Sequence, residues 1–244
     1  MAADIKLENI ILPKDENARL WRYMDFTKFI SMISSKNLFL ARADTFEDIF
    51  EGSFPEKNLE IRERTDKKLF EYGLPADSFT DTYKELRKWT YINCWHSNQH
   101  ESAAMWELYT KTNESIAIET SFKKLKEALP NNVTITYVKY IDYNKDVISE
   151  NFMYTPYIYK RKSFEHEKEV RVITQDINEM LNLKENEKKG INISIQNIND
   201  LIDFIHICPK APEWFIEIVK EISSTYGIDV KKVKKSNLYS DPIY

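Results

Sequence analysis

Three glutamates, each two residues from the next, stand at the start of a β-branched segment, Phe164-Glu165-His166-Glu167-Lys168-Glu169-Val170-Arg171-Val172-Ile173. The β-branched residues favour an extended chain, because their side chains suit a pleated, half-buried surface. Side chains alternate along a strand, so Glu165, Glu167 and Glu169 are expected on one face, with His166 and Lys168 on the other. Three neighbouring carboxylates repel one another. That face is either a solvated strand edge that discourages aggregation or a place where negative charge is needed.

The composition bounds the class of protein. The chain has 244 residues, of which 42% are hydrophobic and 13% aromatic, which is ample for a core. With 4 glycines and no G-x-G-x-x-G or Walker-type loop, glycine-rich nucleotide folds have no support. The net charge of −4 gives no overall attraction to nucleic acid, and the basic run Lys231–Lys235 is expected to be a solvated strand end. Without a signal peptide or a transmembrane-length apolar stretch, we expect a cytoplasmic protein with no membrane partner.

Hydrophobic spacing predicts strands and helices in mixed order, without regular βαβ alternation. The expected strands are 20–23, 38–41, 91–96, 115–120, 132–142, the acidic strand, 192–195, 204–208 and 229–233. The expected helices are one between Phe26 and Asn37, two within 56–90 broken at Gly73-Leu74-Pro75, then 101–109, 122–129, a tyrosine-rich one before the acidic strand, and 214–226. Asp25 and Ser121 are expected as N-caps and Asn37 as a C-cap. This order predicts one α+β domain over residues 1–244, with a mixed, largely antiparallel sheet.

Two further segments carry charged groups suited to binding. Arg22, on the expected first strand, suits phosphate or ribose oxygens, although a surface arginine stacked on a neighbouring ring explains it equally. The loop with Glu47, Asp48 and Glu51 offers a substrate lid or a divalent-cation site. Its oxygen spacing does not match a calcium loop, so a loop pinned by its phenylalanines, Phe46 and Phe50, is favoured.

The segment Cys94–Tyr109 leaves a strand through a polar turn and enters a helix. Such a turn places hydroxyls and backbone N–H groups at a helix N-terminus, a common arrangement for binding anions. His96 and His100 are its potential metal ligands, but no third ligand follows at a recognised spacing, so no metal is expected. A nucleophilic pair of Cys94 and His96 is disfavoured, because strand positions this close do not by themselves bring a base to a thiol.

These segments, in this order, resemble an uncharacterised bacterial family, domain of unknown function 2971. The matching pieces are Leu20-Trp21-Arg22-Tyr23, Phe46-Glu47-Asp48, Phe50-Glu51-Gly52, Cys94-Trp95-His96-Ser97, Met105-Trp106 with Tyr109, Val138-Lys139-Tyr140 and Glu167-Lys168-Glu169-Val170-Arg171. The resemblance runs from about Leu20 to beyond Arg171, within a family-like core of about residues 20–235. It departs from the family pattern at Glu47-Asp48-Ile49, where Asn-Asp-Pro is usual, and at Phe164, where a Trp is usual. The family name implies no activity.

An arginine on the first strand, a hydroxyl on a middle strand and Glu-x-Glu on a later strand also resemble the Arg–Ser–Glu plan of ADP-ribosyltransferases. That resemblance implies a compact, split antiparallel sheet that binds NAD without a glycine-rich loop. Arg22 would hold the NAD phosphate or ribose. Ser97 would take the serine position, with His96 or Ser102 as alternatives.

The same resemblance implies a mechanism. Cleavage of the nicotinamide–ribose bond passes through an oxocarbenium-like state, as in glycoside hydrolysis. Glu169 would be the catalytic glutamate, held against the ribose 2′-hydroxyl. There its interaction with the ribose would become stronger as positive charge develops in the transition state. Glu167 would lie nearer the acceptor. The remaining residues assigned to NAD binding are His96 and the rings expected to stack on nicotinamide, Tyr23, Trp95, Trp106 and Tyr109.

The function expected from the sequence is therefore an NAD-binding, ADP-ribosyltransferase-like protein that modifies a macromolecule or hydrolyses NAD, with Arg22, Ser97 and Glu169 converging on one cleft. A role as a toxin or in phage defence follows by analogy. One alternative is a non-catalytic sensor of a nucleotide-like ligand. Another is a metal-dependent hydrolase or nuclease that uses Asp48, Glu51, Glu167 and Glu169.

The two cysteines, Cys94 and Cys208, lie in apolar strand-like runs, which predicts reduced, buried thiols with a structural role. We expect both to react slowly with a thiol reagent in the native protein, because buried thiols in apolar surroundings are poor nucleophiles. The measurement compares labelling rates of native and denatured protein. Rapid labelling of either native thiol would contradict the prediction.

Overall fold

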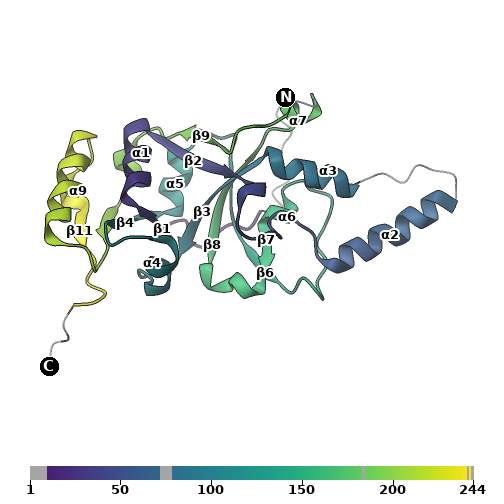
Figure 1. Ribbon diagram of the computed structural model, residues 1–244, viewed down its shortest axis with the longest axis horizontal. Helices are drawn as coiled ribbons and strands as arrows, with labels where there is room; N and C mark the ends of the chain where they lie inside the picture. Colours follow the sequence, from purple (N-terminus) through teal and green to yellow (C-terminus); the bar gives the residue numbers. More distant parts are fainter. Residues whose placement is uncertain (1–9, 72–78, 183–184, 241, 243–244) are drawn as a thin grey trace. The chain divides into compact units, whose positions relative to one another are not determined.

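The computed structural model describes residues 10–71, 79–182, 185–240 and 242 (Figure 1). The chain divides into two compact units. Unit 1 comprises Met1–Leu12, Leu40–Asn93 and Thr134–Ile191, and unit 2 comprises Pro13–Phe39, Cys94–Val133 and Asn192–Tyr244. Each unit combines three segments that are distant in the sequence, so neither forms without long-range contacts.

Unit 2 contains a β-sheet with the strand order β11-β10-β4-β1-β3. Its strands are β1 (Arg19–Asp25), β4 (Ser115–Ser121), β10 (Phe204–Ile207), β11 (Val233–Lys235) and the second half of β3 (Thr90–Ser97). Adjacent strands are antiparallel except β10 and β11, which are parallel. Leu20, Ile118 and Ile205 are fully buried, which places the apolar core along these central strands.

The helices of unit 2 are α1 (Phe26–Ser35), α4 (Ala103–Tyr109), α5 (Phe122–Ala128), α8 (Ile198–Leu201), α9 (Glu213–Thr225) and η5 (Val230–Lys232). Ser121 caps α5 as predicted. Asp25 occupies the N-cap of α1 as predicted, but its carboxylate accepts a hydrogen bond from the Lys111 N–H at 3.0 Å and makes no hydrogen bond to the helix backbone. The C-cap is Lys36 in the left-handed conformation (φ 53°), and Asn37 already belongs to the next strand.

In unit 1, strand β8 (Glu169–Gln175) pairs with β5 (Thr134–Tyr137) and β3. Strand β2 (Asn37–Arg42), which belongs to this unit from Leu40 onward, pairs with β3 and with β9 (Gly190–Ser194), which belongs to it up to Ile191. A separate parallel pair is formed by β6 (Lys139–Ile141) and β7 (Tyr159–Arg161). The helices of this unit are η2 (Ala43–Thr45), α2 (Glu56–Glu71), α3 (Phe79–Leu86), η3 (Arg87–Trp89), α6 (Thr155–Ile158), η4 (Lys162–Glu167) and α7 (Ile177–Leu181).

The acidic strand is shorter than predicted. Glu165 and Glu167 belong to η4, Lys168 adopts the left-handed conformation (φ 41°), and the strand begins at Glu169. The strand alternation that was expected to place three glutamates on one face does not apply before Glu169, so that expectation is wrong.

Other boundaries also differ. The expected strand over 132–142 is two strands, β5 and β6, and the tyrosine-rich helix is the single turn α6. The last strand begins at Val233, because 230–232 form η5. The predicted break at Gly73-Leu74-Pro75 lies outside the described residues.

The α+β class with a mixed, largely antiparallel sheet flanked by helices is confirmed. The single domain over residues 1–244 and the ADP-ribosyltransferase-like form of the fold stay predictions. Within the described part of the chain, the helices are too short or too polar to cross a membrane.

Gly52 is a position where any side chain would be strained. Its φ is +71°, and a Cβ at this position would lie 2.4 Å from Cε1 of the fully buried Tyr157 ring. We expect Gly52→Ala to lower the free energy of unfolding by roughly 2 kcal/mol or more, because left-handed strain and overpacking add. The measurement is denaturant unfolding. Gly227→Ala is the control, since Gly227 has φ +78° but no atom within 4 Å of its Cβ position. Equal losses in the two variants would contradict the packing argument.

Candidate functional site

Arg171, in unit 1, is fully buried and surrounded by acceptors. Its Nη1 and Nη2 donate to the two oxygens of Glu51 at 2.7 and 2.8 Å. Its Nε donates to Glu169 Oε2 at 2.8 Å, and Nη1 also donates to the Tyr157 carbonyl at 2.8 Å. A bidentate pair of this kind is the strongest form of charged hydrogen bond. Arg171 therefore joins the loop of Glu51 to the first residue of β8.

Lys160 extends this cluster. Its ammonium donates to Glu167 and lies 3.3 Å from Glu169 Oε1. Burial alone would lower the pKa of Lys160, but the carboxylates of Glu169 and Glu167 outweigh it and raise the pKa. Glu51 differs, because burial raises its pKa despite the opposing charge of Arg171. Burying these ions costs several kcal/mol each, which their mutual hydrogen bonds offset.

The solvated-edge interpretation of the acidic motif is wrong for two of its three glutamates. Glu167 and Glu169 are 8% and 4% exposed and contact cations, whereas Glu165 is exposed. The backbone N–H of Glu169 also donates to the Tyr140 hydroxyl at 2.8 Å. Lys160 contacts Oε1 of Glu169 and Arg171 contacts Oε2, so the carboxylate is held in one orientation.

The acidic loop before Glu51 is anchored by a cation as well. Asp48 accepts a hydrogen bond from Arg161 at 2.7 Å, and Arg161 lies 4.2 Å from the ring centre of Phe50, which fits the predicted pinned loop. Glu47 is exposed. Among the described residues, no group of three or more His, Cys, Asp or Glu side chains suits a metal ion. The carboxylates assigned to a metal-dependent hydrolase instead pair with arginine or lysine, which does not favour that alternative.

In unit 2, the strand register assigns the side chains of β1 to two faces. Trp21 pairs with His96, and Leu20 pairs with Ser97. Directly paired residues share a face, and side chains alternate along a strand. One face therefore carries Trp21 and His96 and is called here the Trp21 face. The other carries Arg22 and Ser97 and is called the Arg22 face.

The Arg22 face holds a guanidinium without a carboxylate. Arg22 lies 5.9 Å from the Trp95 ring centre, and its Nη1 lies 4.0 Å from the Met32 sulfur. Among the described residues, no carboxylate oxygen is within ion-pair distance of Arg22. Burial lowers the pKa of Arg22 to about 10, with Cys94 acting in the opposite direction. The buried Trp95 Nε1 also makes no hydrogen bond in the described part of the chain. These N–H groups can donate hydrogen bonds to an anion.

On the Trp21 face, alternate residues of β1 hold the loop Asn98–Ser102. Arg19 and Trp21 donate to its carbonyls at 3.2 and 2.8 Å, and the Tyr23 hydroxyl accepts an N–H of the loop at 2.7 Å. Burial raises the pKa of Tyr23. The Trp106 ring packs edge-on against Tyr23, with ring centres 5.0 Å apart. The polar turn predicted to bind anions is thus tied to the sheet by the first strand.

The residues predicted to bind NAD are divided between these faces. Arg22, Trp95 and Ser97 come together on the Arg22 face, whereas the Trp21 face carries Tyr23, His96 and Trp106. Tyr109, at the end of α4, is 41% exposed. The hydroxyl of Ser102, the alternative to Ser97, caps α4. Glu167 and Glu169 belong to unit 1, so their convergence with Arg22 stays a prediction.

Sequence reasoning missed the ion pair of Glu119 and His206. The two side chains, 87 residues apart, meet at 2.6 Å on the Trp21 face of unit 2. They line a pocket with a volume of about 300 Å³. The available signals were that Glu119 is the one charged residue of the predicted strand 115–120 and that His206 lies between apolar residues in the predicted strand 204–208.

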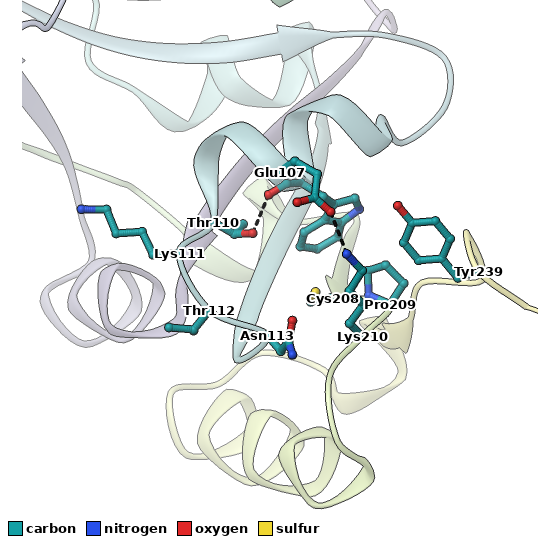
Figure 2. Close-up of a pocket in the computed structure, with 10 residues that line it drawn as sticks. Glu107, Thr110, Lys111, Thr112, Asn113, Cys208, Pro209, Lys210 and Tyr239 are labelled. Atoms are coloured by element: carbon teal, nitrogen blue, oxygen red, sulfur yellow. Dashed lines mark hydrogen bonds and ion pairs between the residues drawn. The ribbon is translucent and has the colours of Figure 1, made fainter.

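A smaller pocket of about 130 Å³ lies beside α4 (Figure 2). Lys210 and Glu107 form an ion pair of 2.8 Å at its rim, and Trp106 and Cys208 line it. Cys208 is buried as predicted, and burial raises the pKa of its thiol. Cys94 is only partly buried, so the prediction of burial is wrong there, although both cysteines are free.

Comparison with known proteins gives one family match. Residues 105–172 match the family described as protein of unknown function (DUF2971). The match begins in α4 and ends in β8, so it includes Trp106 and the segment Glu167–Arg171 and confirms the family resemblance over these residues. No curated protein and no solved structure matches the chain.

The buried cluster predicts a large effect of removing its central cation. We expect Arg171→Met to lower the free energy of unfolding by about 3–5 kcal/mol, because Glu51 and Glu169 are left buried without their partner. Lys88→Met is the control, since Lys88 pairs with Glu85 at an exposed site, where such pairs contribute about 0–1 kcal/mol. Denaturant unfolding measures both. An Arg171→Met variant as stable as the control would show that the cluster does not hold unit 1 together.

Proposed function

We propose that this chain binds NAD, or a closely related nucleotide, through an anionic group at the Arg22 face, and acts on it as an ADP-ribosyltransferase or NAD glycohydrolase. The observation that carries the proposal is the Arg22 guanidinium. It is partly buried, its pKa is lowered, and no carboxylate of the described residues pairs with it.

Folding alone does not favour an arginine in this position. A charge withdrawn from water without a partner costs several kcal/mol, whereas an apolar side chain of similar size would pack without that cost. Guanidinium donors match the oxygens of a phosphate, and a ring beneath the cation limits its movement. The Trp95 ring supplies that contact, and the Ser97 hydroxyl lies on the same face.

The proposed reaction breaks the bond between the nicotinamide nitrogen and ribose C1′. The bonding electron pair leaves with nicotinamide, and water or a nucleophile of a macromolecule forms the new bond at C1′. A carboxylate near the ribose stabilises the positive charge of the transition state. The sequence resemblance assigns that role to Glu169 and the acceptor side to Glu167. Lys160 and Arg171 orient the Glu169 carboxylate, and such preorganisation suits electrostatic stabilisation.

The proposed activity also connects to the expected toxin or phage-defence role. A protein that consumes NAD lowers the NAD content of the cell that produces it, which is how such a protein would arrest growth. That role follows by analogy at the level of the fold.

NAD binding by Arg22 is tested with Arg22→Met, which removes the charge and keeps most of the bulk. We expect the dissociation constant for NAD to rise about tenfold or more, because a hydrogen bond to a charged group contributes about 1.5–3 kcal/mol. Stability should stay equal or rise, because the unpaired charge is removed. Calorimetric titration and unfolding midpoints measure the two effects, with Lys28→Met, at an exposed position of α1, as control. Unchanged NAD affinity in Arg22→Met would end the proposal.

Catalysis is tested in the same protein by following free nicotinamide and ADP-ribosylated product. Glu169→Gln should reduce turnover by about a hundredfold or more with nearly unchanged NAD binding, because the contact acts in the transition state. Glu167→Gln should reduce transfer to an acceptor more than NAD hydrolysis. NAD binding without any nicotinamide release by the wild type would instead support the sensor alternative.

A further inference from the structure

The pocket of about 300 Å³ on the Trp21 face is built by four neighbouring strands of unit 2. Trp21 of β1 pairs with Glu119 of β4, and His206 of β10 pairs with Lys234 of β11. All four side chains line the pocket. Its volume is at the lower limit of about 300–1,000 Å³ for ligand sites, which suits a small molecule.

Glu119 is the fixed negative charge of this pocket. Burial alone would raise its pKa, but the hydrogen bond and electrostatic interaction with His206, together with the charges of Lys234 and Arg19, outweigh burial and lower it. The His206 Nε2 lies 2.6 Å from the carboxylate. Glu119 is therefore a carboxylate anion at neutral pH.

Two cations at the rim are placed beside Glu119 and held by a second contact. Arg19 lies 3.6 Å from Glu119 and donates to the Gln99 carbonyl at 3.2 Å. Lys234 lies 3.9 Å from Glu119, and its ammonium is 3.5 Å from the Phe204 ring centre. Ion pairs this long, with cation side chains 51% and 43% exposed, contribute little to stability. Both cations are positioned in advance and retain donors for a ligand.

Glu101 is the second carboxylate of the lining, and its surroundings differ. Its Oε2 accepts hydrogen bonds from Trp106 Nε1 at 3.0 Å and from the Ser236 hydroxyl at 2.6 Å. In the described part of the chain, no cation lies within ion-pair distance of Glu101, and its Oε1 makes no hydrogen bond. The pocket thus contains two cations gathered at Glu119 and a separate carboxylate that neutral donors hold in place.

We infer that this pocket binds a small zwitterion of the α-amino-acid class. The ligand carboxylate lies on Arg19 and Lys234, its ammonium lies on Glu101, and its side chain packs on Trp21. A ligand with charge of only one sign would leave the lining groups of that same sign without an oppositely charged partner, which disfavours it. The site lies on the opposite face from Arg22 and does not depend on the proposed NAD chemistry.

The test titrates the intact chain calorimetrically with each of the twenty standard amino acids. For the tightest, the same titration uses its decarboxylated amine and its deaminated acid. We expect both analogues to bind about tenfold or more weakly, because each lacks one charged hydrogen-bonding group. Lys234→Met and Glu101→Gln should each lower the affinity for the amino acid by a similar factor. Glutamine keeps an acceptor for Trp106 and Ser236, so the loop remains held.

Lys235→Met is the matched control. Lys235 is the next residue of β11, points to the opposite face and pairs with Glu213. The Lys235→Met variant should bind the amino acid with the same affinity as the wild type. Unfolding midpoints check that every variant is folded. Three results would each overturn the inference: no amino acid binds, the deaminated acid binds as tightly as the amino acid, or Lys235→Met weakens binding as much as Lys234→Met.

Discussion

The guanidinium of Arg171 is the contact on which unit 1 depends. It is withdrawn completely from water, so each of its donors needs an acceptor, and three separate segments supply them. Glu51 comes from the loop after η2, Tyr157 from α6, and Glu169 from the start of β8. Because a buried ion tolerates no unpaired donor, these segments have one arrangement that satisfies all of them. The requirement for glycine at position 52, directly after Glu51 and against the Tyr157 ring, follows from the same close packing.

Arg22 and Arg171 show two opposite uses of the same side chain. Arg171 has a full set of acceptors, and its charge serves the fold. Arg22 lies over a tryptophan ring without a carboxylate among the described residues, and burial lowers its pKa to about 10. The first arrangement stabilises, whereas the second carries a cost that binding an external anion would remove. Arg171 in unit 1 thus serves the fold, whereas the recognition that we propose is assigned to Arg22 in unit 2.

Strand alternation gives unit 2 two chemically distinct faces. Along β1, Arg19, Trp21 and Tyr23 hold the loop Asn98–Ser102, and the first two also border a pocket of mixed charge, while Arg22 points to the opposite side. Strand β1 therefore contributes to two candidate sites, and no side chain of β1 belongs to both. Three successive side chains on one face of β1 form hydrogen bonds to the backbone of the loop Asn98–Ser102 and so hold the loop against the sheet.

The sequence by itself determined the features that depend on local pattern and composition. The α+β class, the central apolar strands, the Ser121 cap and the family resemblance all followed from residue types and short-range spacing. It also singled out Glu167, Glu169 and Arg22 as unusual. It did not show that Lys168 takes a left-handed conformation, which separates Glu167 from the strand of Glu169.

Tertiary structure alone decided which charges meet. Glu51 and Arg171 are 120 residues apart, and Glu119 and His206 are 87 apart, so no local pattern signals either pair. The ion pairs arise because the strand register brings distant residues onto one face, where burial makes a partner obligatory. The same register left Arg22 without a carboxylate partner in the described part of the chain, which no count of charges along the sequence could have revealed.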